Sequence, residues 1–547
     1  MRSIHSSLSS VRLIVVAVFL FGLYAAAIGN LYHLQIAKGK YYAARAESQH
    51  RLAGYLSPSR GGIYLTDKYG NSIPAAINKS YPTIFAVPKE IEDVAEGSAL
   101  VASVLNLDGE KIQRAFGKSN ELYKLLVKKA TEEEVRKVKD ANIRGVYVDT
   151  DEARYYPFGG LAAHVLGFVG SGSDGKEIGR YGIEAQFDDA LAGTPGAVSG
   201  DKIEKPTPGK DVLLTIDRNV QFTAEEILAR LVKTYGAAGG SVIVEDPKTG
   251  KMLALASEPT FDPNTYAMSP VEVFLNPAVQ SLYEPGSIMK VVTMAAALDA
   301  GKITPDTAFY DVGFLTLNGK TIRNWDLKAY GALTMTGVIE HSVNTGAAFA
   351  EQKLGHARFR QYLVNFGLSE PTNIGLPGEL AGNLRNLAKN ARDINFATAS
   401  FGQGISVTPM ELISAISAIA NGGLLMQPYL QAGQSPKLVR RVISKTAAEE
   451  TTRMMVSAVK GAKIADIPGY TVAGKTGTAQ VAERGGYGED VINTYAGFAP
   501  AYDPKFVILI KLDKPKGAPL AGVTVVPAFR ELAEFLLQYY NVPPDHQ

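Results

Sequence analysis

Residues 283–290 read YEPGSIMK and stand at the start of an apolar run that continues to residue 299. The Pro-Gly pair favours a turn, and the run after it predicts a helix over residues 287–299. Ser287 then lies at a helix N-terminus, where backbone N–H groups have no partner within the helix and can stabilise an anion. The helical spacing of three residues brings Lys290 onto the same face. Ser287 is therefore the candidate nucleophile, with Lys290 as its candidate base.

The tetrad Ser-x-x-Lys carries little information by itself, because it also begins at Ser173, Ser199 and Ser457. Ser173 and Ser199 are predicted to lie in glycine-rich loops, which do not hold serine and lysine on one face. Ser457 is predicted to lie in mid-helix, where the helix itself uses the backbone N–H. Only Ser287 combines the tetrad with a turn that opens a helix.

Two further short motifs follow in order along the chain. Residues 342–344 read SVN after a predicted helix, and residues 475–477 read KTG after an apolar stretch that predicts a strand. Another KTG, at residues 248–250, follows Asp-Pro and is predicted to be a turn. The small residues around the second KTG would let a substrate backbone lie close to the strand; they are Gly474, Thr476, Gly477 and Thr478.

The C-terminal two thirds of the chain predict an α+β fold rather than a doubly wound parallel sheet. Apolar runs at residues 240–245 and 252–257 flank a turn, which predicts a hairpin, and residues 506–512 predict a further strand. Helices are predicted by apolar periodicity; they cover residues 111–116, 131–139, 219–233 and 527–540. Residues 145–156 are predicted to be extended.

The N-terminal segment predicts a membrane anchor. Residues 13–34 are apolar and hold no Lys, Arg, Asp or Glu, a length that suits a helix across a bilayer. We interpret residues 1–12 as a short cytoplasmic tail and 13–34 as a retained transmembrane helix. A cleaved signal peptide is the main alternative, because small residues at 25–27 could form a cleavage site, and a buried globular helix is the third.

The rest of the chain divides at a stiff connector. Residues 206–210 read PTPGK, which predicts a non-helical linker. We therefore predict a non-catalytic domain over residues 35–205 and a catalytic domain over residues 211–547.

Composition excludes several classes of function. The 547 residues hold 56 basic and 54 acidic side chains, a balance that argues against a general nucleic-acid binder. The chain has no cysteine, which excludes thiolate catalysis and disulfides. None of the seven histidines has a metal-binding spacing, so no metal or cofactor is predicted.

The motifs beginning at Ser287, Ser342 and Lys475 together resemble those of the class B penicillin-binding proteins. The resemblance extends over nearly the whole chain after the anchor, including LTID at residues 214–217 and RGGIY at residues 60–64. The segment FGQGISVTP at residues 401–409 is similar to one typical of the cell-division branch. SVN departs from the SDN pattern, which class B members commonly vary.

The resemblance implies a D,D-transpeptidase that cross-links peptidoglycan stem peptides through an acyl-serine, in septal wall synthesis. It implies a penicillin-binding fold, preceded by an elongated pedestal domain, and covalent inhibition by β-lactams. It also implies a bacterial cytoplasmic-membrane location with the catalytic domain outside the cytoplasm. Implied partners are a membrane glycan polymerase and other division proteins.

Site roles follow from the motifs and from the resemblance. Lys290 can act as a base only when neutral, and burial together with the second cation, Lys475, would lower its pKa. Ser342 could relay a proton to the leaving amine. The resemblance implies that Asn344 binds the stem peptide, and that the KTG strand meets the donor's terminal carboxylate or backbone through Thr476, Gly477 and Thr478. It implies an oxyanion hole made by the backbone N–H groups of Ser287 and Thr478.

Other functions remain open from the sequence. They are an elongation-type transpeptidase, a β-lactamase or D,D-carboxypeptidase that uses water as acceptor, and a division scaffold without turnover. Other noticeable residues have no predicted catalytic role: Arg60, Arg154 and Glu184 are interpreted as members of structural ion pairs, and His164 as a packed histidine. Trp325 either lines the cleft or packs.

Overall fold

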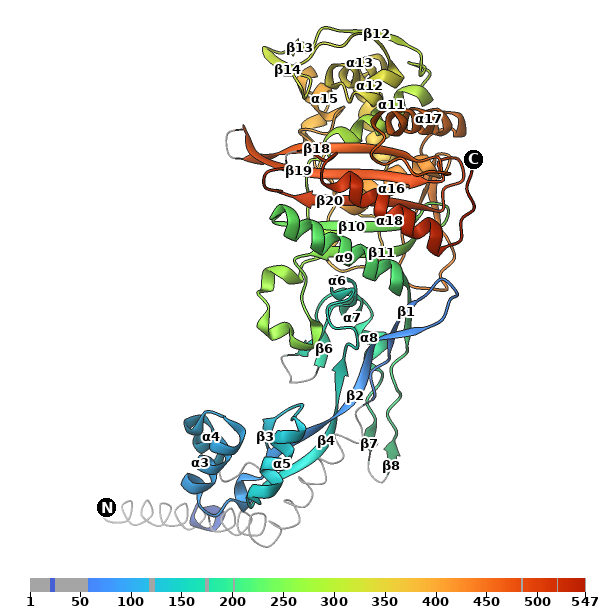
Figure 1. Ribbon diagram of the computed structural model, residues 1–547. Coiled ribbons are helices and arrows are strands. Elements are labelled where there is room, and N and C mark those ends of the chain that lie inside the picture. The colour runs from blue at the N-terminus through green and yellow to red at the C-terminus, as the bar shows by residue number, and fades with distance from the viewer. Residues whose placement is uncertain are drawn as a thin grey trace, which may run out of the picture. The chain divides into compact units, whose positions relative to one another are not determined.

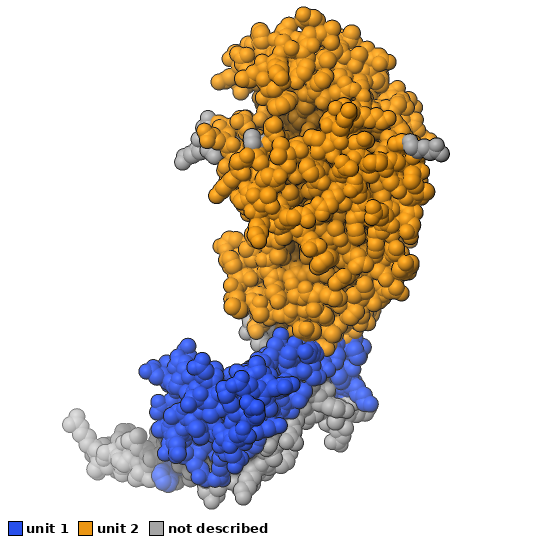
Figure 2. All heavy atoms as spheres, viewed as in Figure 1, with its two compact units in different colours: residues 1–59, 79–153, 193–208 blue, residues 60–78, 154–192, 209–547 orange. Residues whose placement is uncertain are grey.

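The computed structural model describes residues 20–24, 58–117, 123–172, 177–199, 202–483, 486–518 and 520–546 (Figure 1). Within these residues, no helix is both long and apolar enough to cross a membrane. The predicted anchor at 13–34 lies outside the described residues, except for residues 20–24. The chain forms two compact units, each of which draws on separated stretches of sequence (Figure 2). Unit 1 comprises residues 1–59, 79–153 and 193–208, and unit 2 comprises 60–78, 154–192 and 209–547.

A five-stranded antiparallel sheet lies at the centre of unit 2, in the order β11-β10-β20-β19-β18. Its strands are β10 (Gly239–Asp246), β11 (Lys251–Glu258), β18 (Ala473–Glu483), β19 (Gly486–Ala499) and β20 (Phe506–Asp513). The first two form the predicted hairpin, with the KTG of residues 248–250 in its turn. The predicted strand at 506–512 is also confirmed, as is the α+β class.

Helices cover both faces of this sheet, because its strands alternate between two apolar sides (Figure 1). In β20, Ile508 and Ile510 face a core with helices α9 (Arg218–Tyr235) and α18 (Val525–Tyr539), which confirms two predicted helices. Val507 and Leu509 face the opposite core, which holds the helices of the catalytic motifs. Those helices are α11 (Met289–Asp299), α12 (Met335–Glu340), α13 (Asn344–Leu354), α14 (His356–Asn365), α15 (Asp393–Ala399), α16 (Pro409–Ala420) and α17 (Lys445–Ala462).

Strand pairing and buried ion pairs hold residues 60–78 and 154–192 in unit 2. Strand β1 (Ile63–Thr66) pairs in parallel with β9 (Val212–Asp217). Arg60 and Arg154 both bond the carboxylate of Glu184, which is fully buried. The structural interpretation of these three side chains is confirmed.

Unit 1 has its own small core. The distal part of β2 (Ile73–Ala86) pairs with β3 (Lys124–Val127), and β4 (Val146–Tyr155) confirms the predicted extended segment. Helices α3 (Val94–Leu105), α4 (Gly109–Phe116) and α5 (Glu132–Ala141) contribute apolar side chains to this core, and the last two were predicted. Asp93, Asp108 and Thr131 cap their N-termini.

One local prediction was wrong. Ser199 does not lie in a loop: it ends strand β7 (Ala197–Ser199) and pairs with Lys202 at the start of β8 (Lys202–Glu204). Strands of only three residues are too short to show an alternating apolar pattern in sequence. The tetrad at Ser173 lies outside the described residues.

Candidate active site

A tight turn places Ser287 at the start of a buried helix. Gly286 has φ of +59°, a left-handed conformation that favours glycine. A Cβ at this position would come within 3.1 Å of the Ala479 Cβ on β18. Residues Gly286–Ile288 form a 3₁₀ turn, and α11 proper begins at Met289. The predicted helix is thus confirmed, with a first turn that is tighter than expected.

Lys290 is fully buried and lies between two serines. Its Nζ is 3.0 Å from Ser287 Oγ and 3.0 Å from Ser342 Oγ, and it also donates to the Ser342 carbonyl oxygen. The i,i+3 spacing predicted from sequence therefore brings this amine within hydrogen-bonding distance of the candidate nucleophile.

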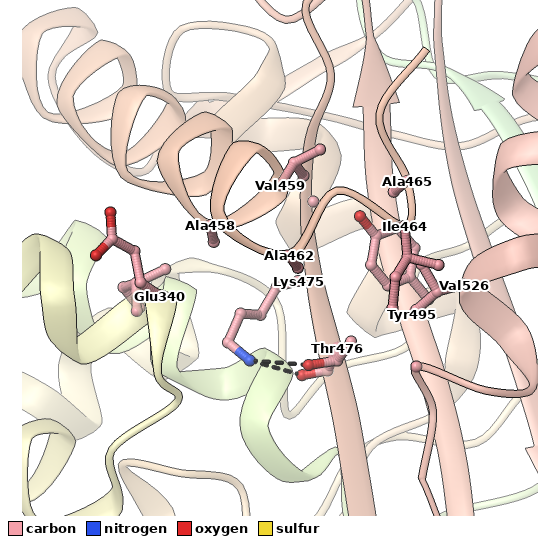
Figure 3. Close-up of a pocket in the computed structure, with 13 residues that line it drawn as sticks. Glu340, Ala458, Val459, Ala462, Ile464, Ala465, Lys475, Thr476, Tyr495 and Val526 are labelled. Carbon is pink, nitrogen blue, oxygen red and sulfur yellow. Dashed lines mark hydrogen bonds between the residues drawn. The ribbon is translucent and has the colours of Figure 1, made fainter.

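A second buried lysine reaches the same serine from the sheet. Lys475 on β18 is 4% exposed, and its Nζ lies 3.0 Å from Ser342 Oγ. The ammonium group also donates to the carbonyl oxygen of Thr476 at 2.9 Å and to its Oγ1 at 3.2 Å, as Figure 3 shows. Ser342 thus lies between the two lysines, although its motif is far from both in sequence.

Burial changes the charge of this pair. It lowers the pKa of Lys290 well below its ordinary value, and the nearby charge of Lys475 lowers it further. Burial also lowers the pKa of Lys475, to about 7. Neither lysine forms a salt bridge with a carboxylate in the part of the chain that the structure describes. Both effects favour the uncharged amine of Lys290, which is the form that can accept a proton.

A strained turn presents the SVN motif. Ser342 has φ of +56°, uncommon for a residue with a side chain, and it lies between α12 and α13. Asn344 begins α13; its Nδ2 donates to the Arg323 carbonyl oxygen at 2.8 Å, and its backbone N–H donates to Asn324 Oδ1 at 3.0 Å. The first contact orients the side chain of Asn344, and the second holds the backbone at the start of α13.

Sequence reasoning missed the polar network that supports this turn. Asn324 donates to Asp311 Oδ2 at 2.7 Å, and Thr345 Oγ1 donates to Asp311 Oδ1 at 2.6 Å. All three side chains are buried. Thr345 directly follows the motif, but no local pattern ties it to Asp311, so only an alignment or a structure could have revealed the network.

The KTG strand packs directly against the nucleophile turn. A Cβ on Gly477 would lie 3.0 Å from the Pro285 carbonyl oxygen and 3.1 Å from Ile288 Cγ1. Here the glycine is needed by the protein's own packing, whereas we had explained it from sequence by the approach of a substrate. Thr478 Oγ1 accepts a hydrogen bond from the Ala521 N–H at 3.4 Å.

A second loop holds the nucleophile turn from another direction. The Gly286 N–H donates to the Gly402 carbonyl oxygen at 3.1 Å, and the Gly404 N–H donates to Glu284 Oε1 at 3.0 Å. Both glycines belong to the FGQG segment, for which the sequence indicated a resemblance but no role. The pair of contacts fixes the residues on either side of Pro285.

The remaining candidates lie away from this cluster or have packing roles. Ser457 is in mid-helix on α17, as predicted, and donates to Glu340. Trp325 is 56% exposed, and its Nε1 donates to the His341 carbonyl oxygen at 3.3 Å. His164 is buried at 2.8 Å from the Val273 carbonyl oxygen, and burial lowers its pKa to about 4.

The residues of the site differ in how far solvent can reach their side chains. Ser287, Ser342 and Asn344 are partly exposed, whereas both lysines are buried. Thr476 and Thr478 are partly exposed on the same strand as Lys475. The arrangement offers a reachable hydroxyl next to a buried amine, which is the geometry required of an activated serine nucleophile.

Two family models match this chain. Residues 240–534 match the penicillin binding protein transpeptidase domain, and residues 55–213 match the penicillin-binding protein dimerisation domain. Both matches include residues that the structure describes, and the first contains all three motifs.

Named relatives are similar over most of their length. Stage V sporulation protein D of Bacillus subtilis is 34% identical over 94% of this chain and 84% of its own. The probable peptidoglycan D,D-transpeptidase PbpC of Pseudomonas aeruginosa is 30% identical, over 97% of this chain and 96% of its own.

Solved structures show the same likeness. A peptidoglycan synthetase from Bifidobacterium adolescentis has a TM-score of 0.71 at 29% identity, covering 90% of this chain and 97% of its own. Penicillin binding protein 3 from Mycobacterium tuberculosis, complexed with aztreonam, has a TM-score of 0.69 at 29% identity, covering 89% and 97%. With both domain models matched and these relatives aligned almost end to end, the chain belongs to the class B penicillin-binding proteins.

Proposed function

We propose that Ser287 is the nucleophile of a peptidoglycan D,D-transpeptidase and becomes acylated by the donor stem peptide. The family and the names of the relatives support the enzyme class. The observation that supports the residue assignment is the placing of Ser287 Oγ 3.0 Å from a fully buried lysine amine. Its partly exposed position in the turn that precedes α11 supports the same role.

Acylation follows from the charge state of Lys290. The neutral amine takes the proton of Ser287, and Oγ attacks the carbonyl carbon of the penultimate residue of the donor. The C–N bond to the terminal residue then breaks. Lys290 returns its proton to the leaving amine through the hydroxyl of Ser342, which lies 3.0 Å away.

Transition-state stabilisation is assigned to backbone donors. The N–H groups of Ser287 and Thr478 would bind the developing oxyanion, since the nucleophile turn and β18 pack against each other at Gly286 and Gly477. Losing one such donor typically lowers turnover by about 10²–10³-fold. Asn344, Thr476, Gly477 and Thr478 are assigned to the donor peptide.

In the second half-reaction the acyl group passes to the acceptor amine, and the proton transfers run in the opposite direction. The amine of a neighbouring stem attacks the ester carbon and loses a proton, the bond to Ser287 Oγ breaks, and that oxygen regains a proton by way of Ser342 and Lys290. Burial lowers the pKa of Lys290, Lys475 lowers it further, and the Lys475 amine donates a hydrogen bond to Ser342 Oγ.

The test is covalent labelling with fluorescent penicillin. We expect purified wild-type protein to be labelled stoichiometrically and Ser287→Ala not to be labelled. Ser457→Ala, which alters another Ser-x-x-Lys tetrad, should label like wild type. Labelling of Ser287→Ala at the wild-type level would refute the assignment.

We further propose a septal role on the outer side of the cytoplasmic membrane, with residues 13–34 as the anchor and a glycan polymerase as partner. The FGQG segment and the similarity to a protein named as an FtsI homolog support the septal branch. Depletion in the native host should give filaments. Round cells would instead indicate an elongation enzyme.

A further inference from the structure

A recess adjoins the catalytic cluster on the side of Lys475 and Thr476 (Figure 3). Its walls come from the end of α17 and its following loop, from the start of β18, and from α18. They are mostly small or aliphatic and include Ala458, Ala462, Ile464 and Val526. The mechanism proposed above uses none of these four side chains.

Two polar groups in this recess stand out. Tyr495 is 3% exposed, and its hydroxyl makes no hydrogen bond with any residue that the structure describes. That hydroxyl lies over Gly474, where a Cβ would come within 2.0 Å of it. Because Tyr495 lines the recess, a polar atom that fills the recess could gain a hydrogen bond from this hydroxyl.

The second polar group is the carboxylate of Glu340, an exposed side chain at the end of α12. It accepts a hydrogen bond from Ser457 and forms no salt bridge in the described part of the chain. In Figure 3, Lys475 lies between Glu340 and Tyr495. The recess thus combines a negative group, aliphatic walls and an unpaired hydroxyl, which together suit an alkyl chain with a cationic amine.

The second half-reaction brings an amine to this side of the catalytic cluster. The attacking amine must occupy the position that the leaving amine has vacated, on the side where Thr476 is assigned to the donor's terminal carboxylate. Lys475 Nζ lies 3.0 Å from the proton-relaying Ser342 Oγ and also lines the recess. The acceptor therefore approaches the acyl-serine past Lys475 and Thr476, which also line the recess.

We propose that this recess, defined by Glu340, Ala462, Ile464, Gly474, Tyr495 and Gly522, binds the aliphatic amine side chain of the acceptor stem. This inference rests on the transpeptidase function proposed above. The methylenes lie against Ala462 and Ile464, and Glu340 attracts the amine while it is still protonated. The Tyr495 hydroxyl bonds a polar group at the far end of the chain.

Gly522 offers a way to fill the recess without touching the nucleophile. A Cβ there would lie 3.7 Å from Ile464 Cδ1, an ordinary contact, so a larger side chain would extend into the open space. Gly461 provides the matched control, because it lies at the end of α17, directly before the recess residue Ala462, and its Cβ would meet nothing within 4 Å. The variants are Gly522→Leu and Gly461→Leu.

The experiment separates the two half-reactions. Acylation is measured with fluorescent penicillin, and transfer with a thioester analogue of the donor's acyl-D-Ala-D-Ala end. Two acceptors compete with water: Nα-acetyl-L-lysine amide, which has a long aliphatic amine, and glycinamide, which does not. The measured quantity is the ratio of aminolysis to hydrolysis for each acceptor.

We expect wild type to favour the lysine derivative about tenfold, the scale that a few methylenes provide in an apolar pocket. Gly522→Leu should lose this preference while acylating at the wild-type rate, and Gly461→Leu should keep it. Tyr495→Phe should reduce the preference for the lysine derivative. Glu340→Gln should reduce it by about two- to fivefold, in keeping with one partly exposed charge.

Several results would overturn the proposal. One is equal use of the two acceptors by wild type. The other is a Gly522→Leu variant that acylates normally and keeps the full preference for the lysine derivative. If Gly522→Leu does not fold, the conservative Tyr495→Phe decides by keeping or losing the preference. Absence of acylation in wild type would refute the transpeptidase assignment as well, whereas normal acylation without selectivity would refute the recess alone.

Discussion

Ser342 Oγ lies 3.0 Å from the nitrogens of both Lys290 and Lys475, and this one hydroxyl connects the helix-borne and strand-borne halves of the site. Two amines buried so close together cannot both be charged without a large cost. The site therefore favours the uncharged form of Lys290 at the expense of stability. The chemistry and the folding free energy are set by the same two side chains.

Removing one of these amines should stabilise the fold below neutral pH. Burial lowers the pKa of Lys475 to about 7, while in the unfolded chain it stays near 10.5. Between these values the unfolded state binds one more proton, so the free energy of unfolding of wild type rises with pH, by up to about 1.4 kcal/mol per unit. Lys475→Met lacks this dependence. It should be more stable than wild type at pH 6, by a margin that shrinks as the pH rises.

Urea unfolding at pH 6 and pH 9 measures this margin. Lys445→Met, at a side chain that is 78% exposed, serves as the control and should change stability by less than about 0.5 kcal/mol at either pH. An equal stability change for Lys475→Met at both pH values would contradict the expectation. Its acylation rate should fall sharply in the same preparation.

At the scale of elements, the close fit of the nucleophile turn against β18 depends on two glycines. Gly286 needs its left-handed φ, and Gly477 leaves room for the Pro285 carbonyl oxygen. Side chains at these points would push the turn and the strand apart. The oxyanion donors assigned to Ser287 and Thr478 come from these two elements, so their spacing is set here.

Gly286→Ala should therefore lower acylation more than it lowers stability. Its Cβ would meet the Ala479 Cβ at 3.1 Å, and a misplacement of about 1 Å can cost about 10²-fold in rate. Gly319→Ala is the control, because its φ is +74° with nothing within 4 Å of the added Cβ. Acylation kinetics with penicillin should show a large loss only in the first variant. A loss below about twofold there would contradict the reasoning.

Elements with strong local signals were predictable from sequence. The hairpin of β10 and β11, the strand β20 and the helix after Ser287 follow from turn residues and apolar periodicity. The network of Asp311, Asn324 and Thr345 was not, because its members lie far apart along the chain and each looks like an ordinary surface residue. The pairing of β7 with β8 was missed because strands of three residues are too short to show an alternating pattern.

The partners of the catalytic motifs were only partly predictable. Helical spacing brings Lys290 to Ser287, but the meeting of Ser342 with Lys475 depends on tertiary packing that no local rule gives. Their assembly was predicted from the order of three motifs rather than from physics. The contact of Gly402 with Gly286 had no basis of prediction at all.

At the scale of the whole molecule, unit 2 is assembled from three separated stretches, and a buried carboxylate joins two of them. Glu184 is fully buried and bonds Arg60, Arg154 and the Tyr156 hydroxyl. Because removing one partner leaves buried charges uncompensated, this cluster is far more sensitive to truncation than a surface ion pair.

Glu184→Ala should lower the free energy of unfolding of unit 2 by about 3–5 kcal/mol. The surface pair of Arg230 and Glu531, which are 56% and 51% exposed, provides the comparison. Glu531→Ala should cost less than about 1 kcal/mol. Denaturant unfolding followed by Trp325 fluorescence measures both, and similar losses in the two variants would contradict the assignment of the cluster as a structural joint.

The packing of Gly477 on the Pro285 carbonyl oxygen also bears on how drug resistance could evolve. A substitution that widened the turn to exclude a β-lactam would equally misplace the nucleophile for the natural donor, which must use the same atoms. Substitutions selected by antibiotics are therefore expected around the site rather than in it, where the inhibitor and the wall precursor differ in shape. Surveillance of resistant isolates should find changes on the surrounding loops while residues 285–287 and 475–477 stay constant.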